Sequence, residues 1–237
     1  MHFFYAPQFA NQQYVLLGQE AWHCARVLRS KLGEEIHVLD GLGNTYAGKL
    51  TAISEQNCSV NVQQITHQPQ PENQYLHVAI APTKQTERME WFVEKAVELG
   101  VNTISFLETA RTEKTNIRME RIQKTAISAL KQSGGKWLPI IQAPIKFPDF
   151  IRQTIQSNSK ILPLIAALSP QSKPIRQVAA PPCRAVVCIG PEGDFTPAEL
   201  NLAEQNEFIF VSLGQTRLRT ETAGIAVCCW LHPILTA

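Results

Sequence analysis

The chain has 237 residues, which is enough for one large domain or for two unequal ones. Hydrophobic residues make up 44% and charged residues 18%, so intrinsic disorder and a long coiled coil are both excluded. Because no apolar run approaches the roughly 18 residues of a membrane span and the first residues do not resemble a signal peptide, we expect a globular cytoplasmic protein.

Short alternating or β-branched runs separated by Gly and Asn dominate the first 70 residues, with one helical segment at 20–29. We expect a small β-barrel here, with strands at 14–17, 35–39, 45–53 and 59–65. The Asp40-Gly41-Leu42-Gly43-Asn44 segment lies between two of these runs and predicts a hairpin turn, not a nucleotide-binding loop. The Pro-containing polar stretch at 68–73 predicts a linker between domains 1–70 and 71–237.

After the linker, apolar strings alternate with helical patterns, which predicts an α/β domain with a largely parallel sheet. The strings lie at 76–81, 103–107, 161–166, 185–189 and 208–211. A helix with Met89, Phe92, Val93, Ala96 and Val97 on one side is expected to end at Gly100. Residues 169–182, with four prolines, predict a surface loop.

Basic residues are concentrated between 111 and 136, a window that contains only two acidic residues. The seven basic residues are Arg111, Lys114, Arg118, Arg121, Lys124, Lys131 and Lys136. A helix over 117–132 would place its apolar residues Met119, Ile122, Ala126, Ile127 and Leu130 on one side. Arg118, Arg121, Lys124 and Lys131 would take the other side. This face is either a solvated surface or a contact for a polyanion, and the pattern leaves both open.

The six cysteines include no C-x-x-C pair, and those at 183, 188, 228 and 229 lie in apolar strings. We expect buried free thiols and no metal site. The sequence also lacks G-x-x-x-x-G-K-[ST], G-x-S-x-G and H-E-x-x-H, which disfavours an NTP-dependent enzyme and the common hydrolases.

Two glycine-containing loops follow predicted strands in the final fifty residues. The first, Gly190 to Phe195, precedes a helix start marked by Thr196, Pro197 and Glu199. The second, from Ser212 to Gly224, precedes a helix of small and apolar residues. Ligands bind at the carboxyl ends of strands in open α/β sheets, so the two loops could form opposite walls of one pocket. Arg219 and Glu221 are either a plain ion pair or part of a site.

Four segments together resemble the bacterial 16S ribosomal RNA uridine-N3 methyltransferases of the knotted SPOUT superfamily. They are GPEGDFTPAEL at 190–200, SLGQTRLRTETA at 212–223, the region from Lys84 through Met89-Glu90-Trp91 to Val101, and His23 to Arg29. The resemblance implies a PUA-like RNA-binding barrel before a methyltransferase domain with a C-terminal trefoil knot. It also implies bound S-adenosylmethionine, a homodimer and small-subunit ribosomal RNA as substrate.

The resemblance assigns the cofactor to Gly190, Pro191, Glu192, Gly193, Ser212, Leu213, Gly214, Leu218 and Ala223. Arg219, or Arg217, would stabilise negative charge on the uracil, and Glu221 would orient Arg219. RNA phosphates would be held by Arg26, Arg29, Lys31, Arg111, Arg118, Arg121, Lys124 and Lys136.

The chain departs from the family pattern at three places: Gly135 where Arg is usual, Asp194 where Gly is common, and Gln215-Thr216-Arg217 where Pro-Arg-Ile is common. Two alternatives therefore stand beside uridine methylation. One is a non-catalytic RNA-binding protein of the same fold, and the other is a SPOUT methyltransferase with a different RNA target.

Overall fold

The computed structural model describes residues 2–7, 13–113, 116–156 and 160–231. Contacts divide the chain into unit 1, Met1–Gln70 with Ile127–Leu138, and unit 2, Pro71–Ala126 with Pro139–Ala237. The first boundary falls inside the predicted linker, whereas the segment 127–138 packs with the N-terminal residues. Lys114 of the basic window lies outside the described residues.

Unit 1 is built on a five-stranded sheet in the order β1-β3-β4-β5-β2. Two register shifts in the β4–β5 pairing, at Ala47/Gly48 and Leu50/Ala52, bend the sheet around its core. The elements are β1 (Phe3–Tyr5), β2 (Gln13–Leu17), α1 (Gln19–Trp22), the π-helical turn η1 (His23–Val27), β3 (Glu35–Leu39), β4 (Asn44–Ile53) and β5 (Asn57–His67). The four expected strands are confirmed, and β1 is an addition.

The hairpin predicted at 40–44 joins β3 to β4, which pair antiparallel. Asp40 Oδ1 accepts the backbone N–H groups of Leu42 at 2.7 Å and of Asn44 at 3.1 Å. The carboxylate of this acidic residue is therefore used to close a turn, as predicted.

Unit 2 contains a seven-stranded sheet, in the order β10-β12-β9-β11-β6-β7-β8, in which every pairing is parallel. Its strands are β6 (Tyr75–Ile80), β7 (Thr103–Glu108), β8 (Ile140–Lys146), β9 (Leu162–Ala166), β10 (Lys173–Pro174), β11 (Arg184–Ile189) and β12 (Ile209–Ser212). Its helices are α2 (Thr86–Glu98), α3 (Met119–Ser133, which ends in unit 1), α4 (Phe147–Gln156), α5 (Ile175–Val178), α6 (Pro197–Gln205) and α7 (Thr220–Leu231).

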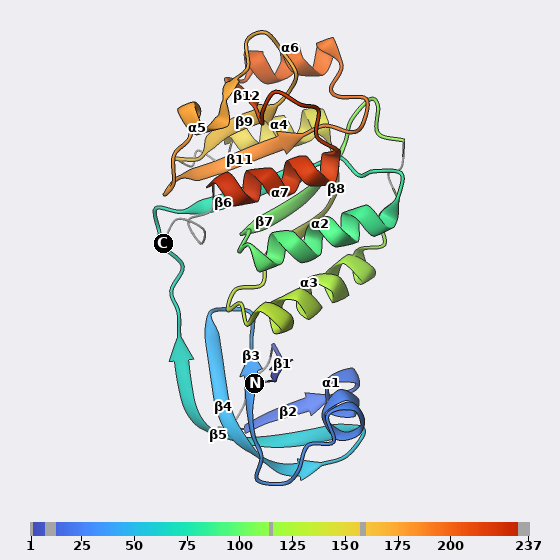
Figure 1. The fold of residues 1–237 in the computed structure, drawn as a ribbon, viewed down its shortest axis with the longest axis vertical. Coiled ribbons are helices and arrows are strands. Elements are labelled where there is room, and N and C mark those ends of the chain that lie inside the picture. The colour runs from blue at the N-terminus through green and yellow to red at the C-terminus, as the bar shows by residue number, and fades with distance from the viewer. Residues whose placement is uncertain (1, 8–12, 114–115, 157–159, 232–237) are drawn as a thin grey trace. The chain divides into compact units, whose positions relative to one another are not determined.

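The central strands are mostly apolar and buried, as expected where helices cover both faces of the sheet (Figure 1). On one face Ala79, Val186 and Cys188 pack with the phenylalanines of α4 and with Ala203 of α6. On the other face α7 packs against α2 and β6. The expectation of an α/β domain with a largely parallel sheet is confirmed, while the trefoil knot stays a prediction.

Two expectations for unit 2 need correction. The segment 169–182 is not simply a loop, since it contains β10 and the single turn α5. The edge strand β8 was not expected at all. The helix of 89–97 is confirmed as α2, and the chain turns after it at Gly100 with a φ of 79°.

Helix α3 has the predicted apolar side, with Ile122, Ala126 and Leu130 buried. Its basic side is less free than expected. Within unit 2, Arg121 Nε lies 2.5 Å from Glu90 Oε1, and within unit 1, Lys131 Nζ lies 2.5 Å from Glu20 Oε1. Two of the four expected outward cations are thus already paired.

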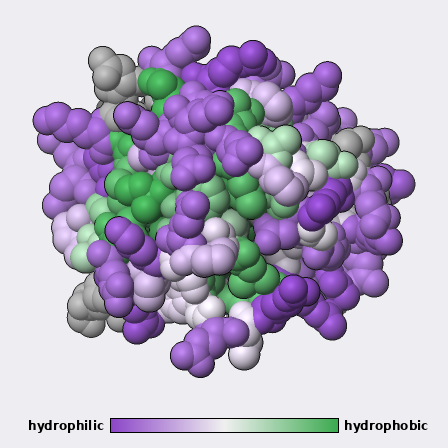
Figure 2. Space-filling view, turned by 90° about the horizontal axis from the view of Figure 1, so that it is seen from above, coloured by the Kyte–Doolittle hydropathy of each residue, from purple (hydrophilic) through white to green (hydrophobic). Residues whose placement is uncertain are grey.

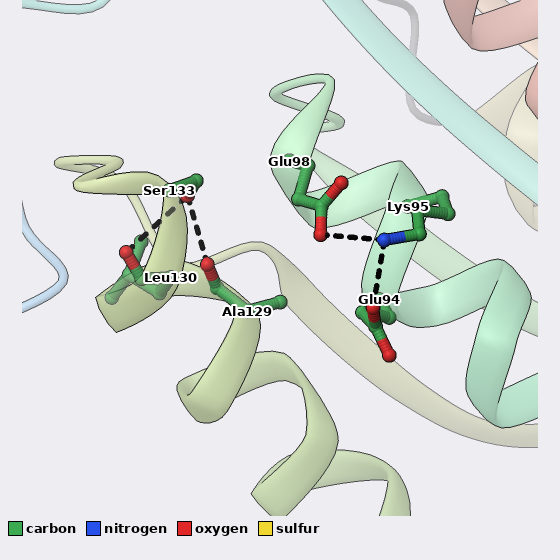
Figure 3. Close-up of polar contacts among 6 residues, drawn as sticks. All are labelled: Glu94, Lys95, Glu98, Ala129, Leu130 and Ser133. Atoms are coloured by element: carbon green, nitrogen blue, oxygen red, sulfur yellow. Dashed lines mark hydrogen bonds and ion pairs between the residues drawn. The ribbon is translucent and has the colours of Figure 1, made fainter.

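Both helix ends in Figure 3 are stabilised by polar contacts. Near the end of α2, Lys95 Nζ donates to Glu94 Oε1 at 2.7 Å and to Glu98 Oε1 at 2.9 Å, which raises the pKa of Lys95. At the end of α3, Ser133 Oγ donates to the carbonyls of Ala129 and Leu130. The Ser133 hydroxyl therefore satisfies carbonyls that a helix C-terminus leaves exposed, whereas Lys95 pairs only with side chains of its own helix.

Apolar surface remains outside the core of unit 2. Trp91 of α2, Leu168 after β9 and Leu218 before α7 are all exposed. In a space-filling view of the molecule from above, hydrophobic residues gather across the middle of the visible face and hydrophilic residues surround them (Figure 2).

Candidate active site

The two glycine-containing loops meet at one end of the unit 2 sheet. Strands β11 and β12 both pair with β9, so their carboxyl ends lie side by side and the loops that follow them face each other. A cavity of about 610 Å³ lies there, a volume within the range of small-molecule sites. It is lined by residues 189–194, 211–214 and 216–220, together with Arg111, Ala223 and residues 166–168.

The first loop is held by its own backbone. The Asp194 N–H donates to the Pro191 carbonyl at 2.9 Å, which closes a turn. A Cβ on Gly190 would lie 3.2 Å from two ring carbons of Phe195, so glycine here lets the buried phenylalanine pack against the strand end. The predicted helix start is confirmed as a capping box between Thr196 and Glu199 at the beginning of α6.

Arg111 belongs to this cavity, although its sequence context suggested a phosphate contact. Its Nη1 donates to the Gly193 carbonyl at 2.5 Å, and a Cβ on Gly193 would lie 3.2 Å from Arg111 Cδ. The preceding residue, Ala110, donates its N–H to Glu199 Oε1 at 2.8 Å. The buried Glu199 therefore joins the loop after β7 to the start of α6.

The second loop is open where it borders the cavity. Gly214 has a φ of 133°, in a region that favours glycine, and a Cβ there would meet no atom within 4 Å. Its conformation is supported by Ser212, whose Oγ donates to the Gly214 carbonyl at 3.1 Å. Thr220 Oγ1 donates to the Gly190 carbonyl at 3.2 Å and so connects the second loop to the first.

The charged residues of the second loop separate into two groups. Arg217 and Arg219 are exposed and line the cavity. Glu221 is buried behind it, with Oε1 3.6 Å from Nε of Arg88 on α2. Its Oε2 is buried without a hydrogen-bond partner in the described part of the chain. The ion pair of Glu221 is thus with Arg88, and orientation of Arg219 by Glu221 stays a prediction.

All nine residues expected around the cofactor line this cavity. The cavity is also lined by Ala166, which ends a predicted strand, and by Ala167 and Leu168, which follow it; their place at the carboxyl end of a strand is a usable signal. The sequence marks Asp194 as a departure from the family pattern but does not place it in the wall. Nothing in the sequence indicated that Arg111 would reach Gly193, 82 positions further along the chain.

The remaining basic residues differ in how free they are. In unit 2, Arg118 and Lys124 are exposed, as are Arg29 and Lys31 in unit 1. Arg26 is exposed but is bound to Glu55 through Nε, at 2.8 Å from Oε1. Lys136 Nζ lies 4.8 Å from the centre of the Phe3 ring, and partial burial lowers the pKa of Lys136.

Across the described residues, no three His, Cys, Asp or Glu side chains are grouped as metal ligands would be. The six cysteines are unpaired, and burial raises the pKa of the Cys188 and Cys228 thiols. None of the described helices combines the length and the apolar character that a membrane crossing requires.

Comparisons with known proteins agree with this architecture. The model of the RNA methyltransferase domain matches residues 70–232, and that of the RNA methyltransferase PUA domain matches residues 16–63. The chain is 29% identical over 215 residues to a Synechocystis protein named ribosomal RNA small subunit methyltransferase E, which covers 89% of this chain and 69% of that one.

Two crystal structures resemble the whole chain. One is of a "probable rRNA-methyltransferase" from Porphyromonas gingivalis, with a TM-score of 0.87 and 37% identity over 96% of this chain and 95% of that one. The other is ribosomal RNA small subunit methyltransferase E from Neisseria gonorrhoeae bound to S-adenosyl methionine, with a TM-score of 0.85, 26% identity, and coverage of 97% and 95%. With a family domain spanning well over half its length behind a PUA domain, this chain belongs to the RNA methyltransferases.

Proposed function

We propose that the chain transfers a methyl group from S-adenosylmethionine to N3 of a uridine in small-subunit ribosomal RNA. The observation that carries the proposal is the cavity itself, where two backbone-rich loops face each other and two exposed guanidinium groups, Arg217 and Arg219, border the space. We assign RNA binding to residues 1–70 and methyl transfer to residues 71–237.

The cavity fits an adenosine-containing cofactor. Its volume suits a molecule of that size, and the Gly214 Cβ direction is empty, so a flat group can approach the backbone there. Gly190, Gly193, Ser212, Leu213 and Gly214 would hold it mainly through backbone groups. S-adenosylmethionine supplies an electrophilic methyl group on a positively charged sulfur.

The residues around the cavity must make a poor nucleophile reactive. Uracil N3 carries a proton at neutral pH, and its loss places negative charge on the neighbouring carbonyl oxygens. Arg219, with Arg217 two residues before it, would stabilise that charge as it develops. The transfer is otherwise a displacement that requires the two reactants to be held in line, which is the task of the two loops.

The exposed cations would hold the RNA around the target base. Arg118 and Lys124 in unit 2, with Arg29 and Lys31 in unit 1, are available for phosphate contacts. Arg26, Arg121 and Lys136 would first have to exchange their present contacts. A base within structured RNA must also leave its stack to enter the cavity.

We further propose that the protein acts as a homodimer in the cytoplasm. The exposed Trp91 of α2 supports a protein–protein contact, because a large apolar side chain left in solvent can be covered by a partner. Sedimentation equilibrium tests this directly, and a monomer at micromolar concentration would contradict it.

Methylation of unmodified small-subunit ribosomal RNA by the purified protein tests the function. Nucleoside mass spectrometry after incubation with S-adenosylmethionine should show one new N3-methyluridine. As a control, Gly214→Val should abolish cofactor binding without unfolding the protein, because the new side chain enters the cavity at a φ that β-branched residues avoid. RNA binding without cofactor binding would instead favour a non-catalytic protein, and methylation of another RNA would change the target.

A further inference from the structure

Asp194 adopts a backbone conformation that residues other than glycine rarely use. Its φ is 60°, in the left-handed region. The turn is nevertheless well fixed, since the Asp194 N–H donates to the Pro191 carbonyl and Asp194 Oδ1 accepts the Phe195 N–H at 2.8 Å. A side chain retained at such a position is a reason to ask what its functional group does.

The Asp194 side chain stands at the wall of the cavity. The residue is half-buried and lines the space between the two loops. One carboxylate oxygen is used by Phe195, and Oδ2 has no protein partner among the described residues. Arg111 reaches the same loop but donates to the Gly193 carbonyl. The wall formed by this loop therefore carries the Asp194 carboxylate, with one oxygen free of partners within the described ranges, together with the Arg111 guanidinium.

The charged residues that the two loops bring to the cavity differ in sign. The carboxylates of Glu192 and Asp194 lie on the loop after β11, where the Arg111 guanidinium is also bound, whereas Arg217 and Arg219 lie on the loop after β12. A cationic group is stabilised where it lies closer to the Asp194 carboxylate than to the Arg111 guanidinium, and an anionic group is stabilised near the second loop. Asp194 is the less exposed of the two acids, so solvent screens its charge less.

The proposed cofactor and its product differ in charge at one atom. S-adenosylmethionine carries a sulfonium, and loss of the methyl group leaves the neutral thioether of S-adenosylhomocysteine, with the remainder of the molecule unchanged. We propose that Asp194 makes the cavity selective for the cationic methyl donor over the neutral product. The inference rests on the proposed function, and it would favour replacement of product by fresh donor after each transfer.

The decisive variant is Asp194→Asn. Asparagine tolerates the same φ and retains an oxygen for the Phe195 N–H, so the substitution removes charge and little else. Titration calorimetry should show the dissociation constant for S-adenosylmethionine rising roughly fivefold, as expected for a partly exposed charge pair. The value for S-adenosylhomocysteine should stay within about twofold, and raised salt should reduce the difference.

Glu207 supplies matched controls. It also has a positive φ, 63°, but lies at the end of α6 and does not line the cavity. Glu207→Gln removes a carboxylate elsewhere and should leave both affinities unchanged. Asp194→Gly and Glu207→Gly both remove the strain of a positive φ from the backbone, but only Asp194→Gly should lose selectivity between the two ligands.

The outcomes separate the inference from the proposed function. If wild-type protein binds both ligands and Asp194→Asn changes both affinities equally, or neither, charge selectivity by Asp194 is refuted while the proposed function stands. If the wild type binds neither ligand, the proposed function fails, and this inference fails with it.

Discussion

Substitution of Gly224 by alanine should destabilise the protein, against the usual effect of this change in a helix. Gly224 lies within α7, where alanine normally stabilises by about 1 kcal/mol. Here a Cβ would lie 2.4 Å and 2.7 Å from two ring carbons of Phe92 on α2, and 3.2 Å from Ile80 Cδ1 on β6. Phe92 is fully buried, so its ring has no free space to enter.

The magnitude follows from these two opposing effects. Overpacking a rigid core costs about 1–3 kcal/mol, and the enclosed ring places Gly224→Ala near the upper limit. Subtracting the gain in helix propensity leaves a loss of about 2 kcal/mol in the free energy of unfolding. For a chain of this size that corresponds to a melting temperature lower by about 4–8 °C.

Thermal unfolding followed by circular dichroism measures the effect, and a double-mutant cycle identifies its cause. Phe92→Leu shortens the side chain that the new methyl group meets, so Gly224→Ala should cost at least about 1 kcal/mol less in that background. A Gly224→Ala protein that melts above the wild type would refute the close packing of α7 against α2.

Three further results are expected. Arg219→Ala should lower kcat on the order of 10²-fold with little change in RNA affinity if Arg219 acts in the transition state; single-turnover assays at saturating substrates decide, and an unchanged rate would remove it from the mechanism. Arg118→Ala and Lys124→Ala should each flatten the salt dependence of RNA binding by about one unit, and Arg121→Ala by less, because Arg121 is paired with Glu90. Burial lowers the pKa of His77 to about 4 from its ordinary 6.5, so the unfolded chain binds more protons between these values. The free energy of unfolding should therefore fall by up to about 3 kcal/mol as the pH drops from 6.5 to 4. In a His77→Asn variant, urea denaturation measured across this pH range should show a weaker dependence of that free energy on pH.

Strands in the sheet interior were predictable, and strands at its edges were not. β6 and β11 end in apolar runs, Val78 to Ile80 and Ala185 to Ile189, as expected for strands with helices on both faces. β8 lies at the edge and has no buried residue, and its isoleucines are interrupted by Gln142, Ala143 and Pro144, so it shows neither a continuous apolar run nor a regular alternation. β10 is only two residues long, at the opposite edge, within a segment whose prolines indicated a loop.

The loops of the site were predictable as loops, but their partners were not. Glycines and a helix cap after an apolar strand indicate a ligand-binding position wherever the sheet is parallel. The contacts of Glu221 with Arg88, and of Arg111 with Gly193, depend on which elements become neighbours in three dimensions. No local pattern records which elements become neighbours, so the sequence does not predict these two contacts. An RNA contact by Arg111 and the orientation of Arg219 by Glu221 stay predictions.

The central pairing of the unit 2 sheet has a consequence for synthesis on the ribosome. Tyr75 of β6 pairs with Arg184 of β11, so roughly 110 residues must emerge after β6 before its partner exists. At about 5–20 residues per second, β6 waits on the order of 5–20 s with the edge that β11 will cover unpaired, and its residues Val78, Ala79 and Ile80 are apolar. The nascent chain is thus most prone to aggregation in that interval. Slower translation or a missing chaperone should therefore reduce the yield of folded protein, while the stability of the protein that does fold stays the same.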